Sequence, residues 1–91
     1  AYHKLSNLAM AIADYTKTIE LNPNHAMAYF NRGYIYDIQG QSDQALMDYS
    51  KAIEVDPKYA RAYNNRGYIY LMRAQYDSAL ENFQKVLKNE K

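Results

Sequence analysis

The residues of this chain best suited to acid–base chemistry or metal binding are its two histidines, His3 and His25. Imidazole titrates near neutral pH and ligates metals, so a histidine beside a carboxylate or a nucleophile would suggest a catalytic centre. No such motif surrounds either residue. His3 lies at the start of the sequence, and His25 follows "NPN", where a helix is expected to begin. We therefore expect a surface or capping role for both histidines, and no bound metal.

Two aspartates, Asp14 and Asp48, form a second candidate because paired carboxylates can act as acid and base. They stand 34 residues apart in similar surroundings, "ADYTK" and "MDYSK". This is one repeat position seen twice, so we expect them far apart, on the surface of successive helices. The chain has no phosphate-binding or dinucleotide-binding glycine motif and no nucleophile–base pair. The sequence predicts a protein that is not an enzyme and uses no cofactor.

The spacing of 34 residues recurs along the whole chain. "AIADYTKTIELNP" (11–23) aligns with "ALMDYSKAIEVDP" (45–57), and "AMAYFNRGYIY" (26–36) aligns with "ARAYNNRGYIY" (60–70). Self-similarity at a fixed period is typical of a solenoid, in which each unit buries its apolar face against the next.

Each period predicts two helices joined by a turn. Over 26–38, Tyr29, Gly33 and Tyr36 recur at helical spacing on one face, and a second apolar stripe runs over 42–55. Before each first helix stands a dipeptide, "NP" or "DP", which is typical of an N-cap followed by proline at the first helical position. We therefore expect these dipeptides to open the helices.

A glycine lies in the middle of each first helix, at Gly33 and Gly67. Glycine inside a helix costs about 1 kcal/mol relative to alanine. Each is followed by an alanine near the start of the partner helix, Ala45 or Ala79. We expect the missing side chains to let the two helices approach closely.

The two full copies carry ordered anchors: Tyr29-x2-Arg32-Gly33-x2-Tyr36, Ala45-x3-Tyr49 and Pro57, then Tyr63-x2-Arg66-Gly67-x2-Tyr70 and Ala79-x3-Phe83. This order resembles the tetratricopeptide repeat, whose pattern is W-x2-L-G-x2-Y…A-x3-F…P. Tyrosine replaces the tryptophan, and arginine replaces the leucine. The resemblance implies an all-α fold, a solenoid of antiparallel helix pairs in a right-handed superhelix.

The repeat phase divides residues 1–91 into a single domain of about two and a half units. Residues 1–25 are a partial first repeat, 26–59 the second, and 60–91 a third that stops before its final proline. The open ends would expose five apolar residues as possible self-association sites: Leu8, Ile12, Tyr15, Leu80 and Leu87. Either further repeats of a longer chain cover these ends, or copies of this chain cover each other. Because the turn at 5–7 lacks glycine, residues 2–21 could also form one long helix that exchanges between copies.

The first helices provide a surface for partners. In the family that this chain resembles, these helices line a concave groove that binds peptides or partner helices. The matching positions supply aromatic platforms, adaptable methionines, amides and a guanidinium. The predicted groove residues are Met27, Phe30, Asn31, Tyr34, Asp37, Arg61, Asn64, Asn65, Tyr68 and Met72.

Some members of that family hold the acidic C-terminus of heat-shock chaperones with a clamp of lysines, asparagines and an arginine. Asn31 matches an asparagine of this clamp, and Arg61 could replace one lysine. Asn65 stands where the clamp has arginine, and the first-repeat clamp positions precede residue 1. We therefore do not expect a working clamp of that kind.

The family resemblance implies a protein or peptide as the partner, and the composition argues against nucleic acids and membranes. Eleven basic and ten acidic side chains give a net charge of +1, too little for a surface that neutralises phosphates, so we expect no nucleic-acid binding. No apolar run approaches the roughly 20 residues that cross a bilayer, so we expect no membrane insertion. The sequence does not identify a compartment, although its lack of a signal segment favours the cytoplasm.

Overall fold

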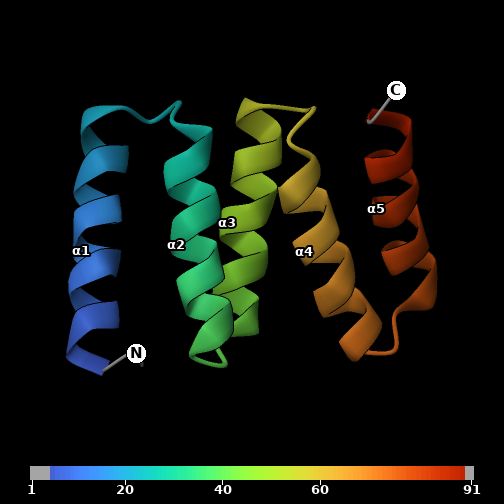
Figure 1. Ribbon diagram of the computed structural model, residues 1–91, viewed down its shortest axis with the longest axis horizontal. Coiled ribbons are helices and arrows are strands. Elements are labelled where there is room, and N and C mark those ends of the chain that lie inside the picture. The colour runs from blue at the N-terminus through green and yellow to red at the C-terminus, as the bar shows by residue number, and fades with distance from the viewer. Residues whose placement is uncertain (1–4, 90–91) are drawn as a thin grey trace.

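The computed structural model describes residues 5–89, which form five helices and no strand. They are α1 (Leu5–Leu21), α2 (Ala26–Ile38), α3 (Ser42–Val55), α4 (Ala60–Met72) and α5 (Tyr76–Asn89). Successive helices run in opposite directions along one row, with α1 and α5 at its two ends (Figure 1). Each helix packs on the next along the chain. The predicted all-α solenoid of antiparallel helix pairs is therefore confirmed.

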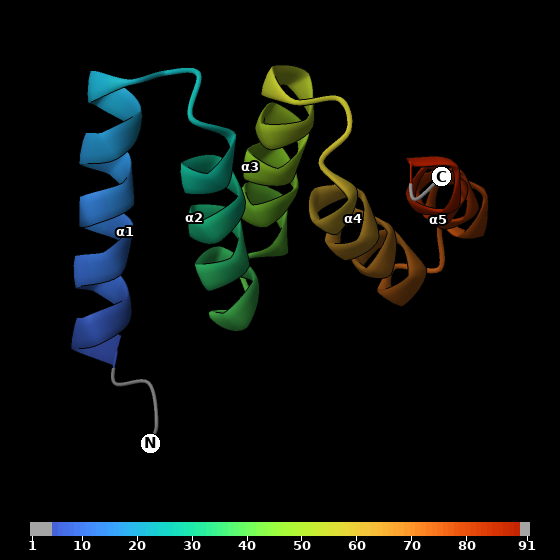
Figure 2. The same ribbon diagram turned by 45° about the horizontal axis from the view of Figure 1, so that its top comes forward.

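The view turned by 45° shows the same order of helices (Figure 2). The core lies where α2, α3 and α4 meet, and it contains Tyr29, Phe30, Tyr49 and Ile69 together with small alanines. Tyr49 is the largest side chain that is completely buried. Among the described residues 5–89, no helix has both the length and the apolar character needed to cross a bilayer.

Gly33 and Gly67 lie at close helix contacts, as predicted, and the expected alanine is among the nearest neighbours at Gly67, where the Ala79 carbonyl oxygen would lie 3.3 Å from a Cβ atom, but not at Gly33. A Cβ atom on Gly33 would lie 3.0 Å from Cβ of Asp48 and 3.1 Å from the ring of Tyr49. At Gly67 the nearest atom would be Cβ of Asn82, at 2.9 Å. The closest side chains belong to residues three and four positions after these alanines in the partner helix, namely Asp48 and Tyr49 at Gly33 and Asn82 and Phe83 at Gly67. The two alanines are buried nearby.

The two arginines that replace the leucine of the family pattern each join three helices. Arg32 of α2 donates from Nε and Nη2 to the two carboxylate oxygens of Asp48 in α3, both at 2.8 Å, and from Nη1 to Thr16 Oγ1 in α1 at 3.1 Å. In the next repeat, Arg66 donates from Nε to Asn82 Oδ1 in α5 at 2.7 Å and from Nη1 to Ser50 Oγ in α3 at 3.1 Å. The hydrogen bonds to Asp48 raise the pKa of Arg32.

The arginine contacts correct the expectation that Asp14 and Asp48 both lie on the surface. Asp14 is exposed, whereas Asp48 is buried against Arg32. The same two repeat positions form a pair in the next repeat, where Arg66 contacts Asn82. Within residues 5–89 no cluster of three His, Asp or Glu side chains forms a metal site.

The prediction that "NP" and "DP" open the helices is wrong. The N-cap of α2 is His25, whose Nδ1 accepts from the Ala28 N–H at 3.2 Å. Asn22 instead accepts from the Asn24 N–H at 3.2 Å, which folds the proline into a turn before the helix. Asp56 does the same with the Lys58 N–H at 3.1 Å, and α4 begins only at Ala60. The expected capping role of His25 is confirmed, while His3 lies outside the described residues.

The start of α1 also differs from the prediction. The turn expected at 5–7 is absent, because these residues already belong to the helix that begins at Leu5. The single helix over 2–21 that we considered extends to residues outside the described part of the chain.

Candidate functional site

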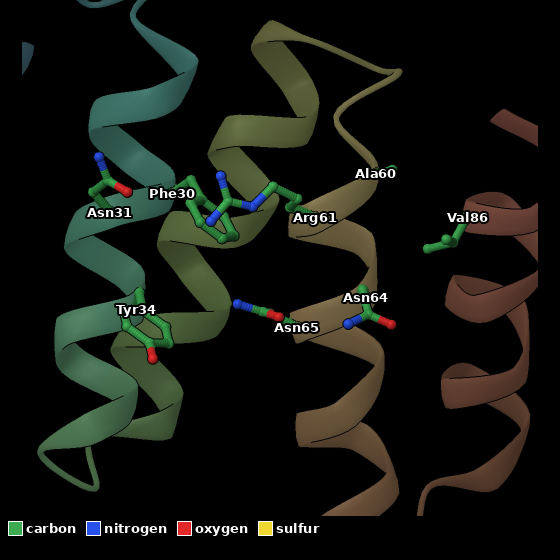
Figure 3. Close-up of a pocket in the computed structure, with 8 residues that line it drawn as sticks. All are labelled: Phe30, Asn31, Tyr34, Ala60, Arg61, Asn64, Asn65 and Val86. Atoms are coloured by element: carbon green, nitrogen blue, oxygen red, sulfur yellow. The ribbon is translucent and has the colours of Figure 1, made fainter. Parts of the chain in front are cut away.

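A groove of about 670 Å³ lies across the first helices of the two full repeats, α2 and α4, and reaches α5. Figure 3 shows Asn65 extending from α4 toward α2, and Val86 of α5 pointing toward α4. The eight lining residues are Phe30, Asn31, Tyr34, Ala60, Arg61, Asn64, Asn65 and Val86.

Phe30 forms the floor of this groove and is not an accessible contact, which corrects its predicted role. Its side chain is only 3% exposed. The ring stacks on Tyr59 with centroids 5.3 Å apart, and the guanidinium carbon of Arg61 lies 4.9 Å above its centroid. The covering residues come from the start of α4, where Tyr59 is the N-cap and Arg61 lies in the first turn. Asn64 occupies the same repeat position in α4 and is exposed, because no residue among 5–89 covers it as Tyr59 covers Phe30.

Polar side chains connect the groove to the buried Tyr49. Asn65 donates from Nδ2 to the Tyr49 hydroxyl at 3.4 Å, and that hydroxyl donates to Asp37 Oδ2 at 3.5 Å. Burial raises the pKa of Tyr49, so its hydroxyl keeps its proton at neutral pH. Asn65 and Asp37 are both partly buried. One amide of the groove is thus held in place by a fully buried ring.

Burial also raises the pKa of Asp37 above its ordinary value of 3.8, although the Tyr49 hydroxyl opposes this shift. The native state therefore binds the Asp37 proton more tightly than the unfolded chain does. The stability from that proton is present in acid and is lost as the pH rises through the native pKa. We expect Asp37→Asn, which cannot ionise, to raise the melting temperature relative to the parent more at pH 7 than at pH 3.

Thermal melts followed by circular dichroism at the two pH values measure this difference. Asp14→Asn is the matched control, because it removes an exposed carboxylate of α1. If Asp37→Asn changes the melting temperature equally at pH 3 and pH 7, the ionised Asp37 carboxylate does not destabilise the fold through its burial.

The remaining predicted groove residues divide into two sets. Five of them line the groove with accessible or partly accessible side chains: Asn31, Tyr34, Arg61, Asn64 and Asn65. Four lie off the lining: Met27, Asp37, Tyr68 and Met72. Ala60 and Val86 were not predicted. Val86 comes from a second helix, where the repeat pattern provides no signal for a groove position.

The lining is polar and slightly basic. Among its eight residues, Arg61 carries the single charge, and three are asparagines, whose amides both donate and accept. Tyr34 adds an exposed ring with a hydroxyl. Such a surface can bind the backbone amides of another chain and a carboxylate beside them.

Sequence comparisons identify the repeat. Two family models of the tetratricopeptide repeat match residues 26–59 and 48–81, and a third model, of the TPR repeat, matches residues 1–37. The chain belongs to the tetratricopeptide repeat family. A comparison with curated proteins found no match.

Solved structures of tetratricopeptide repeat proteins are similar to this chain. A crystal structure of MamA has a TM-score of 0.84 and 35% identity, covering 87% of this chain and 46% of that one. The second TPR of Spaghetti (RPAP3), bound to the HSP90 peptide SRMEEVD, has a TM-score of 0.83 and 27% identity, covering 89% of this chain and 75% of that one. The chain spans about half the length of the MamA chain that it matches, 46%.

Proposed function

We propose that this tetratricopeptide repeat chain is a non-enzymatic interaction module that holds an extended peptide or a partner helix in the groove between α2 and α4. The observation that carries this proposal is the groove lining, in which asparagine amides, Arg61 and Tyr34 converge from the first helices of successive repeats. The similar RPAP3 repeat, whose structure contains an HSP90 peptide, supports a peptide as the occupant. As part of this proposal, residues 1–91 form one domain divided into 1–25, 26–59 and 60–91.

The geometry of Arg61 sets the expected chemistry of the ligand. Its guanidinium covers the ring of Phe30 with one face, and its side chain is exposed to solvent. The N–H groups at the guanidinium edge remain geometrically able to reach a carboxylate of a bound peptide. Asn31 and Asn65 occupy the same position in successive repeats, so they can bond a peptide backbone at two places along its length.

Replacing Tyr34 and Arg61 together by alanine is expected to weaken peptide binding at least about tenfold, because an aromatic residue and an arginine are typical anchors of an interface. Peptides selected from a random displayed library on the parent chain provide the probe, and isothermal calorimetry measures the Kd. Tyr68→Ala is the matched control. Tyr68 repeats the position of Tyr34, is exposed, and lies off the groove lining.

Binding by the Tyr34→Ala, Arg61→Ala variant that equals binding by the parent would exclude the groove. Loss of binding in the Tyr68→Ala control as well would place the contact on another surface. Both variants change exposed side chains, so circular dichroism should report an unchanged helical fold.

Self-assembly through the solenoid ends is the second candidate function. The exposed leucines of the C-terminal helix α5 favour it, whereas the N-terminal helix α1 does not. Leu80 and Leu87 are 56% and 66% exposed. At the other end Leu8 is buried, with 7% exposed, against the expectation that nothing covers it, and Ile12 and Tyr15 are partly buried. Light scattering over a concentration series tests this candidate, and a monomer at every concentration would exclude it.

A further inference from the structure

One residue of the groove lining, Asn65, has its amide held by two hydrogen bonds in series beneath the groove. Its Nδ2 donates to the Tyr49 hydroxyl at 3.4 Å, and this hydroxyl donates to Asp37 Oδ2 at 3.5 Å. Figure 3 shows the amide nitrogen of Asn65 pointing away from α4, toward α2. Asp37 and Tyr49 are not part of the lining. We call these three residues the Tyr49 relay.

The donors and acceptors of the Tyr49 relay set the direction of the amide. The ionised carboxylate of Asp37 can only accept, so the single hydroxyl proton of Tyr49 goes to Asp37 and the hydroxyl oxygen is left to accept. Asn65 must therefore turn its NH2 group to Tyr49 and its carbonyl oxygen away from it. Among residues 5–89, Asn65 Oδ1 accepts no hydrogen bond, and no fully buried side-chain nitrogen or oxygen lacks a partner. This oxygen is thus accessible within the groove.

The polar groups of the Tyr49 relay are absent together from the third repeat. Leu71 stands at the position of Asp37, and Phe83 stands at the position of Tyr49. The fold therefore accepts apolar residues at both places, whereas burial of the Asp37 carboxylate costs stability at neutral pH. A group that is kept at such a cost, beside a groove residue, indicates a role in binding.

We propose that Tyr49 and Asp37 are positioning residues that turn the Asn65 oxygen toward the bound polypeptide, where it accepts a backbone N–H. This inference rests on the proposed function of the groove and extends it to the chemistry of the ligand. At the place that Asn65 contacts, the groove selects a hydrogen-bond donor and opposes an acceptor, because the fixed amide presents an oxygen there.

Amide-to-ester replacement in a bound peptide tests this selection, since an ester has an oxygen where the amide has its N–H. The probe is a library-selected peptide that the Tyr34→Ala, Arg61→Ala variant no longer binds, and calorimetry gives the Kd of each single-ester form. One ester position should weaken binding to the parent chain about tenfold, through loss of a hydrogen bond and the opposition of two oxygens. Asn65→Ala should reduce this loss to about twofold, which identifies the position that Asn65 contacts.

Variants of the Tyr49 relay should reduce the same loss, although neither residue lines the groove. In Tyr49→Phe the amide can turn and donate an N–H to the ester oxygen, so the loss should fall to about threefold. Asp37→Leu should act in the same way, because the hydroxyl is then free to donate to Asn65. Tyr15→Phe is the matched control. It removes the hydroxyl at the same repeat position in α1, where no hydrogen bond to Asn31 forms among the described residues, and should leave the tenfold loss unchanged.

The direction of the amide is also measurable in the free chain by nuclear magnetic resonance. Nuclear Overhauser contacts are expected between the Asn65 Hδ2 protons and the ring of Tyr49. Tyr49→Phe should shift the side-chain amide signals of Asn65 and leave those of Asn31 in place.

Three results would overturn the inference. They are an Asn65 amide without contact to the Tyr49 ring, the absence of an ester position whose loss depends on Asn65, and an ester loss there that is equal in the parent and in Tyr49→Phe. Any of these with a peptide that still requires Tyr34 and Arg61 refutes the selection alone. Peptides that all bind the Tyr34→Ala, Arg61→Ala variant as well as the parent refute the proposed function, and the selection with it.

Discussion

Replacing Asp48 by alanine is expected to lower the free energy of unfolding by about 3 kcal/mol, because it leaves the guanidinium of Arg32 without its carboxylate between two packed helices. The side chain of Asp48 is 7% exposed and that of Arg32 is 19% exposed. The partial access of water to Arg32 keeps the expected cost at the lower end of the range for broken buried ion pairs. Urea denaturation followed by circular dichroism measures the change.

Asp48→Asn is the matched control, because the third repeat already has asparagine at this position. Asn82 accepts from Arg66 at 2.7 Å, so an amide can satisfy the arginine. We expect this variant to lose only about 1 kcal/mol, which is the net contribution of one hydrogen bond.

A second comparison separates the ion pair from simple packing. Arg32→Leu restores the leucine of the family pattern, and combining it with Asp48→Ala removes both charges. The double variant should be more stable than Asp48→Ala alone, because no charge then remains buried without a partner. If urea denaturation gives Asp48→Ala the same free energy of unfolding as the parent, the contact between Asp48 and Arg32 does not stabilise the packing of these helices.

Gly33→Leu is expected to destabilise the fold by about 1–3 kcal/mol through overpacking. Even a Cβ atom at this position would lie 3.0 Å from Cβ of Asp48 and 3.1 Å from the Tyr49 ring. The rest of a leucine side chain must push α2 and α3 apart or displace that ring. The gain in helix propensity from removing glycine, about 1 kcal/mol, offsets only part of the loss.

Thermal melting of Gly33→Leu and of Tyr34→Leu tests this prediction. Tyr34 is the next residue of α2 and is exposed, so its variant introduces the same side chain on the same helix without the contact. The Gly33 variant should melt well below the Tyr34 variant. Equal melting temperatures would show that the close approach at Gly33 is not required.

The helix bounds could be predicted because local signals and the repeat agree. The stripes recognised over 26–38 and 42–55 coincide with α2 and α3, and Gly40 marks the turn between them, whereas the helix start expected at Pro23 was wrong. Gly40 has a φ of +81°, the left-handed conformation that glycine adopts most readily. The His25 cap of α2 was expected, whereas the cap expected at Asn22 was wrong because the Asn22 side chain bonds within the turn before the helix.

The groove was predictable only in part. Helical spacing places Asn31 and Tyr34 on one face, and translation by one repeat places Asn64 and Asn65 beside them. The burial of Phe30 was not predictable from its own helix, because Tyr59 and Arg61, which cover it, come from the N-cap and first turn of α4. The burial of Asp48 was not predictable from its own helix either, because its partner Arg32 lies on the first helix of the pair.

The two bridging arginines have a consequence for how the array unfolds. Arg32 bonds its own helix pair to α1, and Arg66 bonds the following pair to α3. Neighbour coupling of this kind makes the opening of one unit costly for the next. Unfolding should therefore be cooperative along the row of helices, with no stable species in which one helix pair has melted alone.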